Sequence, residues 1–216
     1  MLTNEDYAKA FHEIKNSITI VNSSLQLLEK QHPEVTDFEY WEDSRDALNY
    51  LREMVRELSQ AKLASDFPMQ PVNLNILLDN VLASIRNLRF SNGFQCKNHI
   101  DDGLPLIMAD SCRLTQAIIN LVKNAYEAMD ETGTIIFKAY QEGCSVHIDI
   151  VDFGGGINPE YQKQMFTPFF TSKPNGTGLG LAITKQIVES HHGFLNYASR
   201  EGDGCTFSII LPLMAK

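Results

Sequence analysis

Two asparagines four residues apart, Asn120 and Asn124, have the residue type and spacing to bind a metal ion together with a phosphate. On a helix, side chains at these positions share one face. A carboxamide oxygen is a suitable ligand for Mg²⁺, which keeps most of its waters and bridges phosphates, and the NH₂ group can donate to a phosphate oxygen. Two asparagines on a helix are more often simply solvated. Here the flanking residues are apolar: Ala117, Ile118, Leu121 and Ala125. We therefore expect the pair to lie beside the core and to bind magnesium.

Asp152 follows a strand-like alternation of apolar residues and precedes three glycines. A carboxylate at a strand end can accept a hydrogen bond from the exocyclic amine of adenine. Glycines such as Gly154 and Gly156 let the backbone approach a base closely and adopt positive φ. On its own, such a segment is more often a glycine-rich turn with a capping aspartate. The prediction of a base-binding site therefore depends on the neighbouring motifs.

A second glycine-rich segment opens a predicted helix: Gly176-Thr177-Gly178-Leu179-Gly180-Leu181. Glycines there permit close approach of the backbone to phosphates, and a helix N-terminus offers free N–H groups to an anion. A glycine-rich helix start is a weak signal by itself. It becomes specific because it follows Asp152 after an interval that contains the run from Phe166 to Lys173.

The first third of the chain has the apolar spacing of paired helices. Apolar residues recur by alternating fours and threes, a period of about 3.5 residues: Tyr7, Phe11, Ile14, Ile18, Val21, Leu25 and Leu28. His32-Pro33 interrupts this pattern, and Thr36 with Glu39 forms a capping box that predicts a second amphipathic helix. An antiparallel hairpin of this kind cannot fully bury both apolar stripes alone. We therefore expect a homodimer in which two hairpins form a four-helix bundle.

Beyond the hairpin the pattern changes to alternating helices and strands, which indicates an α+β protein of two domains. We place the antiparallel helical hairpin at 1–65, a linker marked by Pro68 and Pro71 at 66–71, and an α/β layer at 72–216. Helices are expected at 75–88, from an N-cap at Asp110 to about 129, and at 178–191; strands are expected at 104–109, 134–139, 145–151, 194–199 and 206–211.

Composition excludes several function classes. A formal net charge of −9 argues against a nucleic-acid surface, which needs clustered Lys and Arg. The four cysteines are scattered with no C-x-x-C pair, so zinc and dithiol sites have no support. The start of the chain lacks a signal-peptide pattern, and no apolar run approaches the roughly 20 residues that span a bilayer. We therefore expect a soluble, cytoplasmic chain with no nucleic-acid partner and no membrane contact of its own, although a longer parent chain could be membrane-anchored.

The segment from about Val72 to Leu211 resembles the catalytic, ATP-binding domain of sensor histidine kinases, an α/β sandwich of the Bergerat (GHKL-type) ATPase fold. The family pattern D-x-G-x-G-I is met by Asp152, Gly154, Gly156 and Ile157. The resemblance implies a mobile lid from Phe153 to Gly176, with Lys173 near the phosphates, and a role for Thr206 at the adenine end. It implies that ATP and Mg²⁺ are bound by Asn120, Asn124, Asp152, Gly154, Gly156, Lys173, Gly176, Thr177, Gly178, Leu179, Gly180 and Thr206.

Glu127 departs from the family pattern. Many members carry a basic residue three positions after the second asparagine, where this chain has Glu127. A carboxylate there cannot pair with phosphate directly. It could act through Mg²⁺ or a water molecule, or simply face solvent, and the sequence leaves these alternatives open.

His12-Glu13-Ile14-Lys15-Asn16 matches the phospho-accepting string of the family, H-E-[IL]-[KR]-N. A single exposed histidine on a helix is normally a spectator, so its matching neighbours carry the prediction. Glu13 can hydrogen-bond one ring nitrogen and orient the other for attack. Asn16, one turn further on, could position a water for hydrolysis of a phosphorylated partner. The family usually continues with proline, and Ser17 here predicts a straighter first helix.

Taken over the chain, the resemblance implies a dimeric kinase that moves the γ-phosphate of ATP onto His12. The phosphoryl group would then pass to an aspartate of a response-regulator receiver domain, and the same protein could dephosphorylate that regulator. Two alternatives stay open. One is a phosphorelay or scaffold protein with an inactive nucleotide site. The other is a serine kinase or conformational ATPase of the same fold group, which would not need His12 on a dimerising hairpin.

Overall fold

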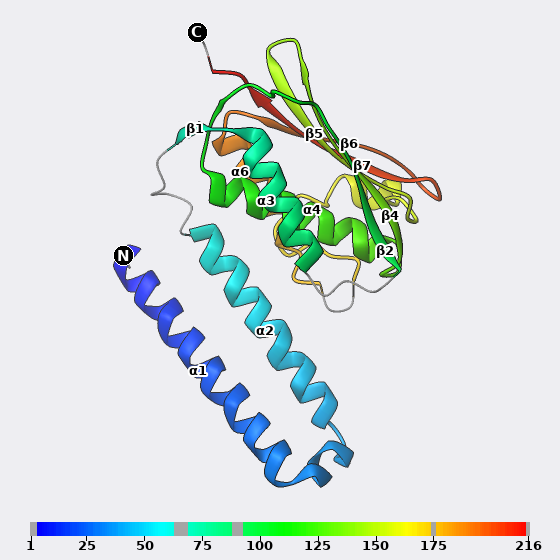
Figure 1. The fold of residues 1–216 in the computed structure, drawn as a ribbon. Helices are drawn as coiled ribbons and strands as arrows, with labels where there is room; N and C mark the ends of the chain where they lie inside the picture. Colours follow the sequence, from blue (N-terminus) through cyan, green and yellow to red (C-terminus); the bar gives the residue numbers. More distant parts are fainter. Residues whose placement is uncertain (1–3, 63–68, 88–92, 174–175, 215–216) are drawn as a thin grey trace.

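The computed structural model describes residues 4–62, 69–87, 93–173 and 176–214, which form a helical hairpin and a globular head (Figure 1). The hairpin consists of α1 (Asn4–Gln31), a short 3-10 helix η1 (Pro33–Asp37) and α2 (Trp41–Lys62). The two long helices run antiparallel, and Arg45 Nη1 donates to Asn22 Oδ1 across them at 3.2 Å. The predicted hairpin is thereby confirmed, and α1 runs as one helix through Ser17.

The turn of the hairpin differs from the prediction. Thr36 does not cap α2, because it lies inside η1 and its hydroxyl donates to the Pro33 carbonyl at 2.9 Å. Pro33 fixes its own φ near the helical value and starts the short helix, so Thr36 falls within η1. Tyr40 has φ 68°, and α2 begins at the next residue, Trp41. The predicted capping box is therefore wrong, whereas the predicted helix itself is present as α2.

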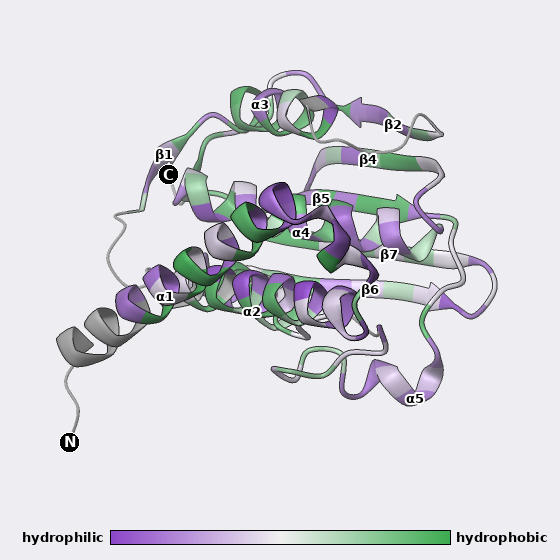
Figure 2. Ribbon diagram, turned by 90° about the horizontal axis from the view of Figure 1, so that it is seen from below, coloured by the Kyte–Doolittle hydropathy of each residue, from purple (hydrophilic) through white to green (hydrophobic). Residues whose placement is uncertain are grey.

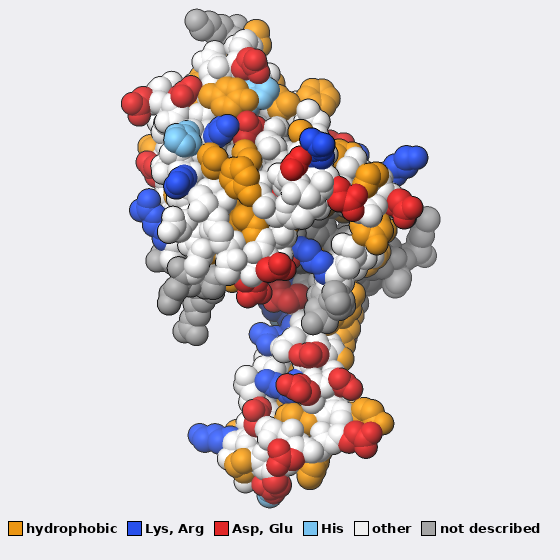
Figure 3. Space-filling model, turned by 90° about the vertical axis from the view of Figure 1, so that its right-hand side faces the viewer, with side chains coloured by type: hydrophobic (Ala, Val, Ile, Leu, Met, Phe, Trp, Pro, Cys, Tyr) orange, Lys and Arg blue, Asp and Glu red, His pale blue; other side chains and the backbone are white. Residues whose placement is uncertain are grey.

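Part of the hairpin surface is apolar. Among the described side chains of α1 and α2, the exposed large apolar ones are Ile14, Ile20, Val21, Leu27, Leu28 and Leu51. Of these, Ile14, Val21 and Leu28 belong to the heptad seam that the sequence predicts for α1. Figure 3 shows apolar side chains on the hairpin among acidic and basic ones. A single hairpin therefore leaves part of its seam exposed to water.

The head is built on a five-stranded mixed sheet. Its strand order is β2 (Phe94–Ile100), β4 (Gly133–Glu142), β5 (Ser145–Asp152), β7 (Gly204–Pro212) and β6 (Phe194–Arg200) (Figure 2). β2 is parallel to β4, and the other neighbours are antiparallel. In β4, Ile135, Phe137 and Ala139 are fully buried, while the residues between them are half-buried. Since side chains alternate across a strand, one face of the sheet packs in the core, which confirms the predicted α/β layer.

Some predicted boundaries in the head need correction. Pro71 was predicted in the linker but lies in β1 (Gln70–Val72), which pairs antiparallel with β3 (Ile107–Ala109). Residues 66–68 of that linker lie outside the described residues. The strand predicted at 104–109 shortens to β3. The prediction missed β2, because this edge strand is rich in polar residues and mostly exposed, and its apolar residues Phe94, Cys96 and Ile100 alternate only in part.

Helices α3 (Leu74–Asn87), α4 (Ser111–Ala128) and α6 (Gly180–Ser190) supply the rest of the core, and the one-turn helix α5 (Pro159–Gln162) lies in the loop after β5. The predicted cap of α4 is confirmed: Asp110 Oδ1 accepts from the backbone N–H of Cys112 and Arg113, at 3.0 and 3.2 Å. The buried face of α4 consists of Leu114, Ala117, Ile118, Leu121, Val122 and Ala125. Over the described part of the chain, no helix combines the length and the apolar character needed to cross a bilayer.

Candidate functional site

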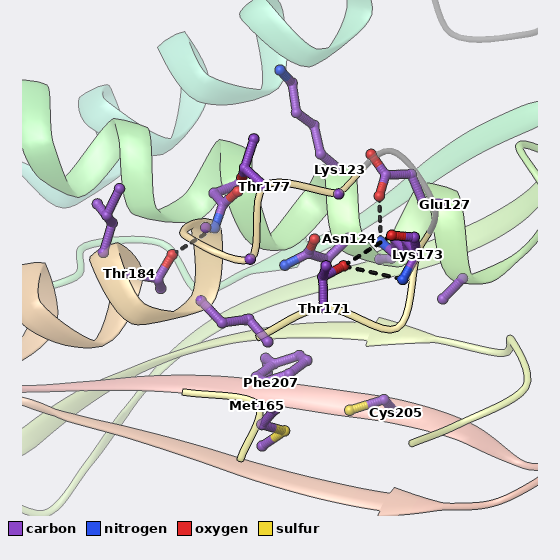
Figure 4. Close-up of a pocket in the computed structure, with 18 of the residues that line it drawn as sticks. Lys123, Asn124, Glu127, Met165, Thr171, Lys173, Thr177, Thr184, Cys205 and Phe207 are labelled. Carbon is purple, nitrogen blue, oxygen red and sulfur yellow. Dashed lines mark hydrogen bonds and ion pairs between the residues drawn. The ribbon is translucent and has the colours of Figure 1, made fainter. Parts of the chain in front are cut away.

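A cavity of about 830 Å³ brings together most of the predicted ligand-binding residues (Figure 4). This volume falls in the range of small-molecule binding sites. The predicted residues that line it are Asn120 and Asn124 on α4, Asp152 at the end of β5, and Gly156, Lys173, Gly176, Thr177, Gly178 and Gly180 on the loop and helix start that follow. Motifs that are far apart in the sequence therefore line the same cavity.

Asn120 is held between two helices. Its Nδ2 donates to the hydroxyl of Thr184 on α6 at 2.8 Å, and Thr184 is fully buried. A Cβ atom added to Gly180 would lie 2.7 Å from Asn120 Oδ1, so any larger residue would displace the Asn120 amide from its position. The first asparagine is thus fixed in place by α6. Asn124, one helical turn on, also lines the cavity.

The side chains on this face of α4 fit a magnesium ion that is shared with phosphates. Two carboxamide oxygens and the Glu127 carboxylate line the cavity from the same helix, and Mg²⁺ prefers such oxygen ligands. Within the described residues, no cluster of three or more His, Cys, Asp or Glu side chains is arranged to hold a metal ion. The amides of Asn120 and Asn124 would therefore bind Mg²⁺ only together with water and the phosphates of a nucleotide.

Asp152 is buried beneath the glycine turn. Its Oδ1 accepts from the N–H of Gly154 at 3.0 Å and from the N–H of Cys205 at 3.2 Å. Burial raises the pKa of the Asp152 carboxyl, and the two backbone donors offset part of that rise. Because both hydrogen bonds use Oδ1, Oδ2 can accept from a ligand. This geometry suits the predicted contact with an exocyclic amine.

The glycines after Asp152 are required by close backbone contacts. A Cβ on Gly156, which has φ 69°, would lie 2.2 Å from the Arg200 carbonyl oxygen. A Cβ on Gly154 would lie equally close, 2.2 Å, to the Ala128 carbonyl oxygen at the end of α4. Gly156 lines the cavity, but Gly154 does not. The structure therefore places Gly154 where it joins the turn to α4, outside the cavity wall.

The loop after the glycine turn brings Lys173 to the cavity. Lys173 Nζ forms an ion pair with the Glu127 carboxylate on α4, and Thr171 Oγ1 accepts from the Lys173 N–H at 3.0 Å (Figure 4). Glu127 therefore does not simply face solvent. Its side chain lines the cavity and pairs with the lysine of the predicted lid. Residues 174 and 175 lie outside the described part of this loop.

The second glycine segment forms the start of α6. Gly178 has φ 67°, and its carbonyl accepts from the Phe169 N–H at 2.9 Å, which joins the two ends of the loop. The N-cap residue of α6, Leu179, has no side-chain capping bond, so the helix N-terminus can accept an anion. The Leu179 side chain is only 4% exposed and belongs to the hydrophobic core. The structure therefore places Leu179 beneath the loop and outside the cavity wall.

At the predicted adenine end, the residues of β7 that line the cavity differ from the expected one. Thr206 does not line the cavity, whereas its neighbours Cys205 and Phe207 do. Since side chains alternate along β7, Thr206 points to the opposite face of the sheet from these two. Burial, together with the nearby Asp152 carboxylate, raises the pKa of the Cys205 thiol to about 12. Cys205 therefore contributes a neutral thiol to this wall.

The predicted phospho-acceptor group lies on the hairpin. His12, Glu13 and Asn16 are all exposed on α1, and none of them lines the cavity. Sequence reasoning missed two charged residues on α2, Glu53 and Arg56, which do line it. No local signal could have identified these two, because they reach the cavity only through the packing of α2 against the head.

Comparison with known proteins gives one consistent result. The family model for histidine kinase-, DNA gyrase B- and HSP90-like ATPases matches residues 109–215. The sensor histidine kinase ZraS of Escherichia coli strain K12 is 34% identical over 203 residues, which is 94% of this chain and 44% of ZraS. The chain thus spans less than half the length of this relative.

Solved structures of histidine kinases have the same fold. The catalytic domain of histidine kinase ThkA superposes with a TM-score of 0.61 at 32% identity, over 68% of this chain and 96% of that one. ThkA in complex with the response regulator protein TrrA gives 0.68 at 29% identity, over 96% and 61%. Full-length ShkA in complex with AMPPNP gives 0.73 at 25% identity, over 98% and 46%.

Proposed function

The chain belongs to the histidine kinases, and from that premise we propose that it transfers the γ-phosphoryl group of ATP to its own His12. The observation that carries the proposal is the cavity in which Asn120, Asn124, Asp152 and the glycine-rich start of α6 meet. This site has a carboxylate suited to an adenine amine, two amides suited to Mg²⁺ and phosphates, and a helix N-terminus suited to an anion.

Each part of the cavity would have its own task in the reaction. Asp152 would accept from the adenine amine, while the open N-terminus of α6 and Lys173 would hold phosphate oxygens. Asn120 and Asn124 would hold Mg²⁺, whose charge would offset part of the negative charge of the phosphates. Because the protein supplies little covalent chemistry in such a transfer, positioning and electrostatics would provide most of the rate enhancement.

The proposed phosphoryl transfer to His12 is a nucleophilic displacement at the γ-phosphorus. One ring nitrogen of His12 would attack the γ-phosphorus with its lone pair. The bond from the γ-phosphorus to the bridging oxygen would break, and ADP would leave with that electron pair. The proton on the other ring nitrogen would be held by the Glu13 carboxylate, which is adjacent in sequence.

Further steps of the proposal concern partners. The phosphoryl group on His12 would pass to an aspartate of a response-regulator receiver domain, and Asn16 would position water for the reverse, hydrolytic reaction. The solved complex of ThkA with TrrA supports a regulator of this kind. The apolar residues exposed on the hairpin support a homodimer in which two hairpins pair.

The proposed function is tested by incubating the chain with γ-labelled ATP and Mg²⁺, alongside His12→Gln. We expect label that acid removes and alkali does not, and that is absent from His12→Gln. Acid-stable label would instead indicate a serine kinase. A folded wild-type chain that neither binds ATP nor takes up label would be a relay or scaffold protein with an inactive nucleotide site.

A further inference from the structure

Helix α2 belongs to the hairpin but forms part of the cavity wall. Glu53 and Arg56 line the cavity from this helix. Met54 and Leu58 of the same helix pack against the hydrophobic core of the head, so the hairpin and the head meet at this level of α2. One wall of the nucleotide cavity therefore comes from the helix that lies beside the histidine-bearing helix α1.

Arg56 lies at the same level along the hairpin as His12. The hydrogen bond between Arg45 and Asn22 places these two residues within about one helical turn of each other along the hairpin. Both helices rise by about 1.5 Å per residue, in opposite directions. Ten residues back along α1 therefore correspond to ten residues forward along α2, which sets His12 within about one turn of Val55 and Arg56. A phosphate bound to Arg56 would lie at the height of the acceptor.

The charges around the cavity leave Arg56 as a suitable cation for the terminal phosphate. Among the described residues, the basic ones that line the cavity are Arg56, Lys123 and Lys173. Lys173, which pairs with Glu127, reaches the cavity from the head and would hold other phosphate oxygens. Lys123 extends from α4 to the side away from Asn124 (Figure 4). Arg56 reaches the cavity from the hairpin side, opposite the head residues that bind the nucleotide.

The existing partner of Arg56 can be exchanged at small cost. Arg56 Nη2 lies 2.6 Å from Glu53 Oε2, and both side chains are about half exposed. An exposed pair of this type contributes little to stability. A guanidinium group, by contrast, binds a phosphate through two parallel charge-assisted hydrogen bonds. A doubly or more highly charged phosphate therefore outcompetes the single charge of Glu53.

We propose that Arg56 is a phosphate-binding residue that leaves Glu53 and holds the γ-phosphate of ATP at the level of His12. The proposal rests on the proposed function, since it concerns the same nucleotide. Arg56 stabilises the negative charge on the γ-phosphoryl group while the bond to the bridging oxygen breaks. ADP, which lacks that group, does not reach Arg56. Glu53 keeps the guanidinium in place when no nucleotide is bound.

The test compares ATP with ADP in the full chain. Binding is measured in a His12→Gln background, where no transfer can occur, with and without Arg56→Ala. We expect Arg56→Ala to weaken ATP binding severalfold and to leave ADP binding within about twofold. In the chain with His12 intact, Arg56→Ala is expected to lower the rate of labelling at saturating ATP by about tenfold or more, and Arg56→Lys to restore part of it.

Matched variants separate this role from a structural one. Arg52→Ala removes a cation one turn away that is exposed and does not line the cavity. This variant should leave the affinities for ATP and ADP and the labelling rate unchanged. Glu53→Gln should raise ATP affinity, because the competitor of the phosphate is gone. Equal loss of ATP and ADP binding in Arg56→Ala, or no loss of either, would overturn the proposal. Because binding is read without transfer, a chain that fails to phosphorylate His12 still tests Arg56.

Discussion

The buried carboxylate of Asp152 combines a binding role with a cost in stability. Burial raises its pKa above the ordinary value of 3.8, so the folded state holds this proton more tightly than the unfolded state does. Stability therefore falls as the pH rises from about 3.8 through the folded-state pKa, and the loss remains at neutral pH. The ionised form proposed to bind the ligand is therefore the form that destabilises the fold.

Asp152→Asn should separate these two effects. The amide oxygen can still accept from Gly154 and Cys205, while the charge is removed. We expect the melting temperature without ligand to rise by a few degrees at pH 7, with a smaller rise towards pH 4. ATP should no longer raise it, because an amide NH₂ would face the adenine amine. Thermal unfolding with and without ATP checks both, with the exposed Asp79→Asn as control. A lower melting temperature for Asp152→Asn would contradict the pKa argument.

Single residues differ in how far the sequence can place them. Asn120, Asn124 and Asp152 were proposed from their own side-chain chemistry and local spacing, and the structure brings all three to one cavity. Thr206 lies outside the cavity wall, because which face of β7 reaches the cavity depends on register, and Cys205 and Phe207 occupy that face. The partner of Glu127 was equally hidden, since Lys173 lies 46 positions away in the chain.

At the scale of elements, His191 joins the end of α6 to the start of α4. The ring is 2% exposed. Nδ1–H donates to the Ile187 carbonyl at 2.7 Å, and Nε2 accepts from the Asp110 N–H at 3.0 Å, which assigns a neutral ring. Asp110 in turn caps the helix that carries Asn120 and Asn124. The two helices that line the cavity are thus held together at the end away from the glycine loop.

His191→Ala should therefore destabilise the head. It leaves the Asp110 N–H without its acceptor and creates a cavity, at a cost of about 2–4 kcal/mol in the free energy of unfolding. His191→Gln, which can supply an acceptor, should lose less. Urea unfolding measures both. The matched control is His192→Asn, at an exposed neighbour with φ 56° where asparagine is tolerated. A cost for His191→Ala no larger than that of the control would show that the ring is dispensable.

The elements themselves were predictable where their signals are local. The cap at Asp110 and the hairpin of β4 and β5 are encoded by short-range chemistry and by apolar alternation. β2 was missed because its alternation of apolar and polar residues is interrupted at Asn98. Thr36 failed as a cap because Pro33 starts a competing helical turn three residues earlier. Each failure arises where two local preferences compete or where tertiary pairing decides.

For the whole molecule, the sequence predicts a hairpin and a head but not how they meet. Each part has its own apolar periodicity, whereas the contact between them, over the described side chains of α2, involves residues such as Met54 and Leu58. No periodicity marks such a contact. Glu53 and Arg56 became visible as part of the cavity only through this docking.

The exposed seam of α1 leads to the last prediction, which concerns assembly. Val21 and Leu28 are 47% and 40% exposed in one chain, and they lie seven residues apart on the predicted seam. Burying them against a second hairpin would remove apolar surface from water. We expect Val21→Glu combined with Leu28→Glu to convert a dimer into a monomer, as measured by light scattering after size-exclusion chromatography.

Ser23→Glu provides the control for charge alone. Two residues correspond to about 200° around a helix, so Ser23 lies on the far side of α1 from Val21, and it is exposed. It should leave the dimer intact. A double variant that stays dimeric would place the contact between copies on the head instead of the hairpin. A wild-type chain that is monomeric at micromolar concentration would require another protein to cover the seam. In the expected case, loss of the dimer with ATP binding retained would show that the nucleotide cavity is complete within one chain.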